Sequence, residues 1–209
     1  MDQVYLEGRK HADKQAVQAA LGIKQGMPSF GVDMAEMKAR LSAIPEVKTV
    51  TITRQLPGSI RVVITERMPA AVWQFDGQQK FVDAEGVVLN REKYAGATSL
   101  PVIVGEDAPK HVRELLALLD TTPSIKPDVV AAVRVGSRRW NIQLSREIVV
   151  MLPEENPQAA WKRFAGLVEH DALLSKAIRS VDMRMEDRVF IMPLEEKQSP
   201  ITLTNARDT

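Results

Sequence analysis

Acidic side chains come closest to a catalytic pattern in this sequence. Asp83 and Glu85 flank a turn, and Glu154 and Glu155 precede an expected helix. Two carboxyl groups held across a cleft could hydrolyse a glycosidic bond by acid catalysis. Turn formation and interaction with the helix dipole explain these four residues more simply. A cell-wall hydrolase with Asp83 or Glu85 as its acid therefore stays an alternative interpretation.

Other catalytic patterns are missing from the sequence. The chain has no Cys, which excludes thiolate zinc sites, disulfide bonds and Cys nucleophiles, and its three His are not spaced as metal ligands. It contains no G-x-S-x-G elbow, no phosphate-binding loop and no S-x-x-K motif. We therefore expect no enzymatic activity, no catalytic residue, no metal and no cofactor.

The charge balance does not indicate a surface that binds nucleic acid. The 28 Lys and Arg residues face 27 Asp and Glu residues, so the net charge is +1. Arg138 and Arg139 precede Trp140, but a nucleic-acid patch needs more basic and aromatic residues than these. An acidic protein partner, or protection of a strand edge by charge, fits them better. No apolar run is long enough to span a bilayer, and no signal peptide is visible.

The spacing of apolar residues predicts a small α+β unit over residues 1–69. Asp33 is an expected N-cap with Glu36 three residues later, and Pro45 ends the helix that follows. The order strand, helix, helix, strand, strand packs two helices on one face of a sheet. The expected strands are 3–7, 49–53 and 60–65, and the expected helices are 13–21 and 33–44.

A second unit is predicted over residues 70–194. Asp76-Gly77 suits a two-residue hairpin turn, and Asn156-Pro157 begins a helix. Two helices are expected, one after Asp107 and one after Asn156. The expected strands are 71–75, 80–83, 87–89, 129–135, 140–144, 147–152, 178–183 and 188–192. This predicts a mainly antiparallel β domain with two added helices, followed by a disordered polar tail at 195–209.

Glu66-Arg67 lies at the end of a predicted strand, beside Pro69. One interpretation is a contact with a partner protein. The other is an ion pair, local or between the two units, that fixes the junction at Pro69. We favour the second, because most ion pairs between neighbouring segments serve only local structure.

The last predicted strand has a pattern of its own. Residues 181–192 alternate apolar with charged side chains and include Arg184, Arg188 and Phe190. A last strand is often an edge strand, and an edge strand accepts a partner's strand by backbone pairing. Coverage of this edge by the tail is the alternative, and the residues alone favour neither.

The run from Gly26 to Trp73 resembles the bacterial cell-division family FtsQ/DivIB. Further matches follow in the same order, and together they cover most of residues 2–194. Glu46 stands where the family often has Trp. The matching segments are Gly26–Pro28, Val32-Asp33, Ile44–Val47, Arg54–Pro57, Ile60–Ile64, Glu66–Ala71, Trp73, Phe81–Val87, Leu100–Gly105 and Ile178–Arg184.

The resemblance implies a POTRA domain at 1–69 and a β domain at 70–194. It also implies a short cytoplasmic segment and one transmembrane helix, which would anchor the full protein in the inner membrane with this chain on the periplasmic side of the septum. The expected role is a non-enzymatic divisome scaffold that binds FtsB and FtsL and helps to control septal peptidoglycan synthesis. Other divisome membrane proteins would bind the POTRA domain.

Family members bind FtsB through the edge of the last strand, so the resemblance also implies site residues. Arg184 matches the family's closing "DlR" and would contact an acidic group. Met185 follows it where the family can have an aromatic residue, and Arg139 is a looser match to a second basic contact. The pairing strand would consist of Arg188, Val189, Phe190, Ile191 and Met192.

A POTRA-bearing transport or outer-membrane assembly factor is the main alternative among binding proteins. That class would continue into further alternating segments of about ten residues. The polar residues at 195–209 favour the scaffold instead.

Overall fold

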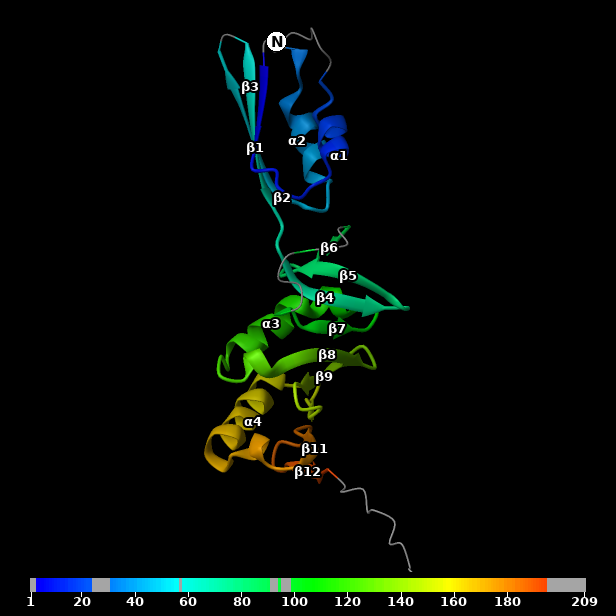
Figure 1. The fold of residues 1–209 in the computed structure, drawn as a ribbon, viewed down its shortest axis with the longest axis vertical. Coiled ribbons are helices and arrows are strands. Elements are labelled where there is room, and N and C mark those ends of the chain that lie inside the picture. Colours follow the sequence, from blue (N-terminus) through cyan, green and yellow to red (C-terminus); the bar gives the residue numbers. More distant parts are fainter. Residues whose placement is uncertain (1–2, 24–30, 57, 91–93, 95–98, 195–209) are drawn as a thin grey trace, which may run out of the picture.

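The computed structural model describes residues 3–23, 31–56, 58–90, 94 and 99–194. Its strands form two sheets, one of three strands and one of nine (Figure 1). The larger sheet has the order β12-β11-β10-β9-β8-β7-β4-β5-β6. The predicted tail at 195–209 lies outside the described residues.

The first sheet belongs to the predicted strand-helix-helix-strand-strand unit. Strand β3 lies in its centre, parallel to β1 and antiparallel to β2. The order of elements confirms the prediction. The elements are β1 (Gln3–Glu7), α1 (Lys14–Leu21), α2 (Met34–Ser42), β2 (Val47–Gln55) and β3 (Ser59–Glu66).

Both helices of this unit begin at an aspartate. Asp13 caps α1 by accepting from the Ala16 N–H, and Asp33 caps α2 by accepting from Ala35 and Glu36. Each helix buries one apolar stripe against β2 and β3, and that burial stabilises the unit. The fully buried side chains of this core include Val17, Met37, Leu41, Ile60, Val62 and Ile64.

The second sheet is mixed, with five antiparallel and three parallel strand pairs. A mainly antiparallel β domain with two added helices is therefore confirmed. The strands are β4 (Pro69–Phe75), β5 (Gln78–Asp83), β6 (Val88–Leu89), β7 (Val102–Val104), β8 (Val129–Val135), β9 (Arg139–Leu144), β10 (Val149–Met151), β11 (Ile178–Asp182) and β12 (Phe190–Pro193). The helices are α3 (Val112–Asp120) and α4 (Pro157–Asp171).

Several strand bounds differ from the sequence prediction, and β7 and β12 are two of the strands concerned. Strand β7 was not predicted, yet it lies inside the sheet, parallel to β4 on one side and to β8 on the other. Three residues are too few to show a strand period, so only its neighbours define it. Strand β12 begins at Phe190, two residues later than predicted, so Arg188 and Val189 precede it.

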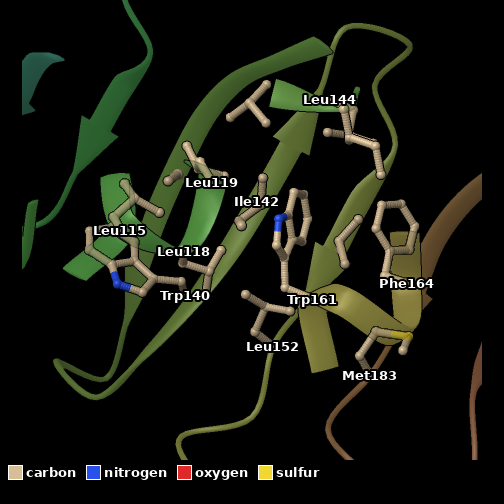
Figure 2. Packing of buried hydrophobic residues seen from close by; sticks show 14 of the residues in the cluster. Leu115, Leu118, Leu119, Trp140, Ile142, Leu144, Leu152, Trp161, Phe164 and Met183 are labelled. Carbon is tan, nitrogen blue, oxygen red and sulfur yellow. The ribbon is translucent and has the colours of Figure 1, made fainter. Parts of the chain in front are cut away.

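One face of the large sheet is covered by α3 and α4, which lie on the same side of it (Figure 1). Trp161 and Phe164 of α4 are fully buried, with ring centroids 5.3 Å apart, and they pack with Ile142 of β9 (Figure 2). The indole Nε1–H of Trp161 donates to the Thr122 hydroxyl at 2.5 Å, so its polar atom is satisfied in the core. This core fixes α4 firmly against the sheet.

The two sheets meet at Arg67, between the end of β3 and the start of β4. Its Nη1 lies 2.6 Å from Asp83 Oδ2 and 2.7 Å from Glu85 Oε2. Lys48 of β2 also reaches Glu85, at 3.1 Å. The side chains of Arg67 and Asp83 are only 16% and 5% exposed. The interpretation of Glu66-Arg67 as an ion pair at the junction is therefore confirmed for Arg67.

Glu46 adds a second connection across the junction. Its backbone carbonyl accepts from the Arg67 N–H at 2.7 Å, and its carboxylate accepts from the Asn90 N–H at 3.0 Å. Glu46 is buried. Glu46 is thus a hydrogen-bonded contact between the two units.

The turn after β5 presents the acids that Arg67 binds. Asp83 Oδ1 accepts from the N–H groups of Glu85 and Val87, each at 2.9 Å. Gly86 adopts a φ of +87°, and a Cβ there would lie 2.3 Å from the Pro109 carbonyl oxygen. Only glycine fits this position, so the turn is fixed against the segment that begins α3.

Replacement of Arg67 by Met should destabilise the protein strongly. The variant leaves the buried Asp83 carboxylate without its cation, which costs about 3 kcal/mol. We expect the thermal midpoint to fall by about 6–12 °C, as measured by scanning calorimetry. The matched control is Arg61→Met, which removes an exposed pair with Glu7 inside the first sheet. Because that pair is exposed to solvent, its loss should change the stability little. An equal loss of stability in both variants would contradict the role of the junction.

Stability should also depend on the charge of Glu66. Burial alone would raise the pKa of Glu66, but N–H donors from Ala12, His11 and Lys10 outweigh it and lower the pKa from its ordinary value of 4.5. A carboxyl group whose pKa is lower in the folded state stabilises the fold above its unfolded pKa, and this contribution is lost as the pH falls through the folded pKa.

We therefore expect Glu66→Gln to lower the thermal midpoint by a few degrees at pH 7, because Gln keeps an acceptor oxygen but not the charge. The gap between variant and parent should close as the pH falls well below 4.5. Melting curves from pH 7 to pH 3 measure this. A gap that stays constant over the whole range would show that the charge of Glu66 has no part in stability.

Candidate functional site

Strand β12 forms one end of the nine-stranded sheet. Among the strands that the structure describes, it pairs only with β11. The side chains of Phe190, Ile191 and Met192 are 56%, 47% and 54% exposed. These residues point to alternate faces of the strand, so both faces of β12 are open. An edge strand with apolar side chains on both faces is a surface suited to pairing with another chain.

The hydrogen-bond pattern of β12 shows which backbone groups face outward. Just after the strand, the Leu194 N–H donates to the Ala177 carbonyl at 3.0 Å. The register shift between Ile178 and Ser180 adds its extra residue on β11, so the alternation along β12 continues. The backbone N–H and C=O groups of Phe190 and Met192 therefore point toward β11, and those of Ile191 point toward the outer edge. Pro193 faces that edge too and has no N–H to offer.

Arg184 follows β11 and binds the carboxylate of Asp182. Its Nε lies 2.8 Å from Oδ1, its Nη2 lies 2.5 Å from Oδ2, and its backbone N–H donates to Oδ1 at 3.0 Å. The side-chain hydrogen bonds from Arg184 lower the pKa of Asp182 and outweigh its partial burial. The Arg184 side chain is still 44% exposed, so a second carboxylate can reach the guanidinium.

Arg139, at the start of β9, lies close to this pair. Its positive charge contributes to the lowered pKa of Asp182. Arg139 and Arg184 line one surface hollow of about 350 Å³. The structure therefore brings together the two basic residues that the sequence separates by 45 positions. The other residues of the hollow are Arg138, Pro153, Glu154 and Glu155.

The remaining predicted site residues lie around the turn between β11 and β12. Met185 is half exposed and follows Arg184 directly. Arg188 pairs with Asp187 at 3.1 Å on the surface, before the strand begins. Val189 is partly buried and packs against the core under the sheet. Arg188 and Val189 therefore precede β12, and Phe190, Ile191 and Met192 lie in it.

Asp182 is the residue at this site that sequence reasoning missed. It lies two residues before Arg184, a spacing that places both side chains on one face of an extended chain. It also lies opposite Phe190 in the β11–β12 register. The opposite charges of Asp182 and Arg184, two residues apart, were the signal in the sequence that could have predicted this ion pair.

The two acids of the hydrolase alternative, Asp83 and Glu85, are engaged at the junction of the two sheets. Asp83 and Glu85 both bind Arg67, and Glu154 lies 3.8 Å from Arg138. Within the described ranges, no three His, Asp or Glu residues are grouped as metal ligands. No helix in that same part of the chain combines the length and apolar character needed to cross a membrane.

Comparison with known proteins matches both units of the chain. Residues 1–67 match the model of the POTRA domain, FtsQ-type. Residues 71–184 match the model of the cell division protein FtsQ/DivIB, C-terminal. The major extracytoplasmic domain of DivIB from Geobacillus stearothermophilus aligns with 52% of this chain and 97% of its own length, at 14% identity and a TM-score of 0.37.

Curated relatives support the same family. Cell division protein FtsQ of Zymomonas mobilis is 32% identical over 87% of this chain, and that of Bradyrhizobium diazoefficiens is 31% identical over 92%. FtsQ of a Jannaschia species is 33% identical over 97% of this chain. The chain spans 58% and 56% of the lengths of the first two relatives. This chain belongs to the FtsQ/DivIB family of cell division proteins.

Proposed function

We propose that this chain is a non-enzymatic divisome scaffold that binds FtsB- and FtsL-type proteins by pairing a partner's strand with the free edge of β12. The observation that carries the proposal is β12 itself. It ends the sheet, it exposes apolar side chains on both faces, and its outer backbone groups have no partner strand among the described residues. Backbone pairing supplies affinity at such an edge, and pockets for alternate side chains supply specificity.

The charges beside β12 support an acidic partner. Arg184 is half exposed, and Arg139 lies in the same hollow. The guanidinium of Arg184 is already ordered by Asp182, so a partner carboxylate binds a preorganised donor. A charge-assisted contact of this kind fixes the register of an added strand and adds to its affinity.

A scaffold role also fits the carboxylates better than a hydrolase role. An acid catalyst needs a carboxyl group that can hold a proton in a cleft. Glu85 has a lowered pKa because Arg67 and Lys48 hydrogen-bond to it, and Asp83 is bound by the same arginine. Both acids therefore serve the junction between the two sheets.

The relatives are longer than this chain, and we infer the location of the whole protein from the family. The full protein would be anchored in the inner membrane by a single helix, with this chain on the periplasmic side at the division septum. The POTRA unit would be open to other divisome membrane proteins, since its edge strands β1 and β2 lie away from β12 (Figure 1).

Reversal of the charge at Arg184 should weaken partner binding. We expect Arg184→Glu to raise the Kd for a soluble periplasmic segment of the FtsB-type protein of the same organism at least tenfold, about 1.4 kcal/mol or more. Calorimetric titration measures the Kd, and circular dichroism checks the fold. Arg179→Glu makes the same charge change at an exposed position of β11 and should bind like the parent. Equal affinity in Arg184→Glu and the parent would refute the role of Arg184.

Strand pairing itself is tested at Ile191. Ile191→Pro removes the N–H that faces the free edge, and it leaves the N–H groups of Phe190 and Met192 in the ladder with β11. We expect this variant to lose most of its affinity in the same titration. Ile191→Val keeps the N–H and should retain the affinity of the parent chain. Failure of the parent chain to bind at concentrations well above micromolar would overturn the proposal.

A further inference from the structure

The turn between β11 and β12 is poorly supported by packing. Met183 at its start is buried, but Arg184 to Arg188 are all exposed. A hollow of about 210 Å³ lies between this turn and the beginning of α4. Apolar packing therefore anchors the turn only at its two ends, through Met183 and Val189. The residues that line the hollow include Pro153, Asn156, Ala159, Arg163, Met183 and Glu186.

Arg163 of α4 reaches across this gap to the backbone of the turn. Its Nη2 donates to the Met185 carbonyl at 2.6 Å and, more weakly, to the Met183 carbonyl at 3.5 Å. Its Nη1 donates to the Glu186 carbonyl. One guanidinium thus binds three carbonyl oxygens within four consecutive residues.

Helix α4, which carries Arg163, is held in place by its packing against the sheet. Trp161 and Phe164, on either side of it in sequence, are fully buried against the sheet (Figure 2). The core therefore fixes the backbone of α4 at Arg163. The hydrogen bonds of the Arg163 side chain then hold the turn against α4. From the other side, Asp182 binds the backbone N–H and the side chain of Arg184.

We propose that Arg163 is a positioning residue for partner binding: it fixes the turn that presents Arg184 and Met185 and that leads into β12. The inference rests on the proposed function, which it deepens. Arg163 holds backbone carbonyls, whereas Arg184 meets the partner. A planar guanidinium suits this role because its donors are held in a fixed fork, whereas a lysine ammonium is a single point charge.

The experiment compares Arg163→Met and Arg163→Lys with the parent chain, using amide hydrogen exchange without any partner. We expect Arg163→Met to speed exchange of the amides from Arg184 to Met192 about tenfold, with strands β7 to β9 unchanged. The exchange rates in Arg163→Lys should lie between those in Arg163→Met and those in the parent chain. Lys162→Met, at the exposed neighbouring position on α4, is the matched control and should exchange like the parent.

The same variants are then titrated with the FtsB-type periplasmic segment. We expect Arg163→Met to raise the Kd about tenfold, with partial recovery in Arg163→Lys. Parent-like exchange in the turn of Arg163→Met would overturn the inference, as would faster exchange with unchanged affinity. If Arg163→Met does not fold, Arg163→Lys decides by the same two measurements.

A parent chain that fails to bind would refute the proposed function. The exchange measurement would then show separately whether Arg163 fixes the turn, because it needs no partner.

Discussion

The arrangement of this molecule depends on the guanidinium of Arg67. Strand β3 of the first sheet runs into β4 of the second with only two residues between them, and Arg67 is one of these. By binding Asp83 and Glu85, it ties this connection to the turn after β5. Lys48 and Glu46 add contacts from the first unit, to Glu85 and to the Asn90 N–H. A connection that could have been a hinge is thereby held by partly buried charges, and buried charges must stay paired.

The other end of the large sheet is built in the opposite way. Ion pairs and hydrogen bonds close the junction. At β12, in contrast, no strand of the described residues pairs with the outer edge, and the apolar side chains are exposed on both faces. An isolated edge of this kind favours association with another strand. The arginines around it serve two separate purposes in our interpretation. Arg163 donates hydrogen bonds to backbone carbonyls of the turn, and Arg184 presents an exposed guanidinium group.

Much of this architecture could be predicted from the sequence. Asp33 caps its helix as predicted, and Asp76-Gly77 forms its hairpin turn with positive φ at both residues. Strand β7 could not be predicted, because three apolar residues carry no period and its two parallel neighbours are distant in the chain. The start of β12 was misplaced because Val189 alternates like a strand residue but packs into the core.

For the site, the sequence determined the types of residue: a basic pair at Arg139 and Arg184, and an apolar run from Val189 to Met192 in a last strand. It also determined the family, since a co-linear set of short matches is visible without any structure. Only the tertiary structure decided which groups the arginines bind, because the ion pair Arg67–Asp83 and the hydrogen bond from Arg163 to the Met185 carbonyl join separate elements. Local spacing specifies periodic elements, but the partner of a long flexible cation is set by the packing of the whole chain.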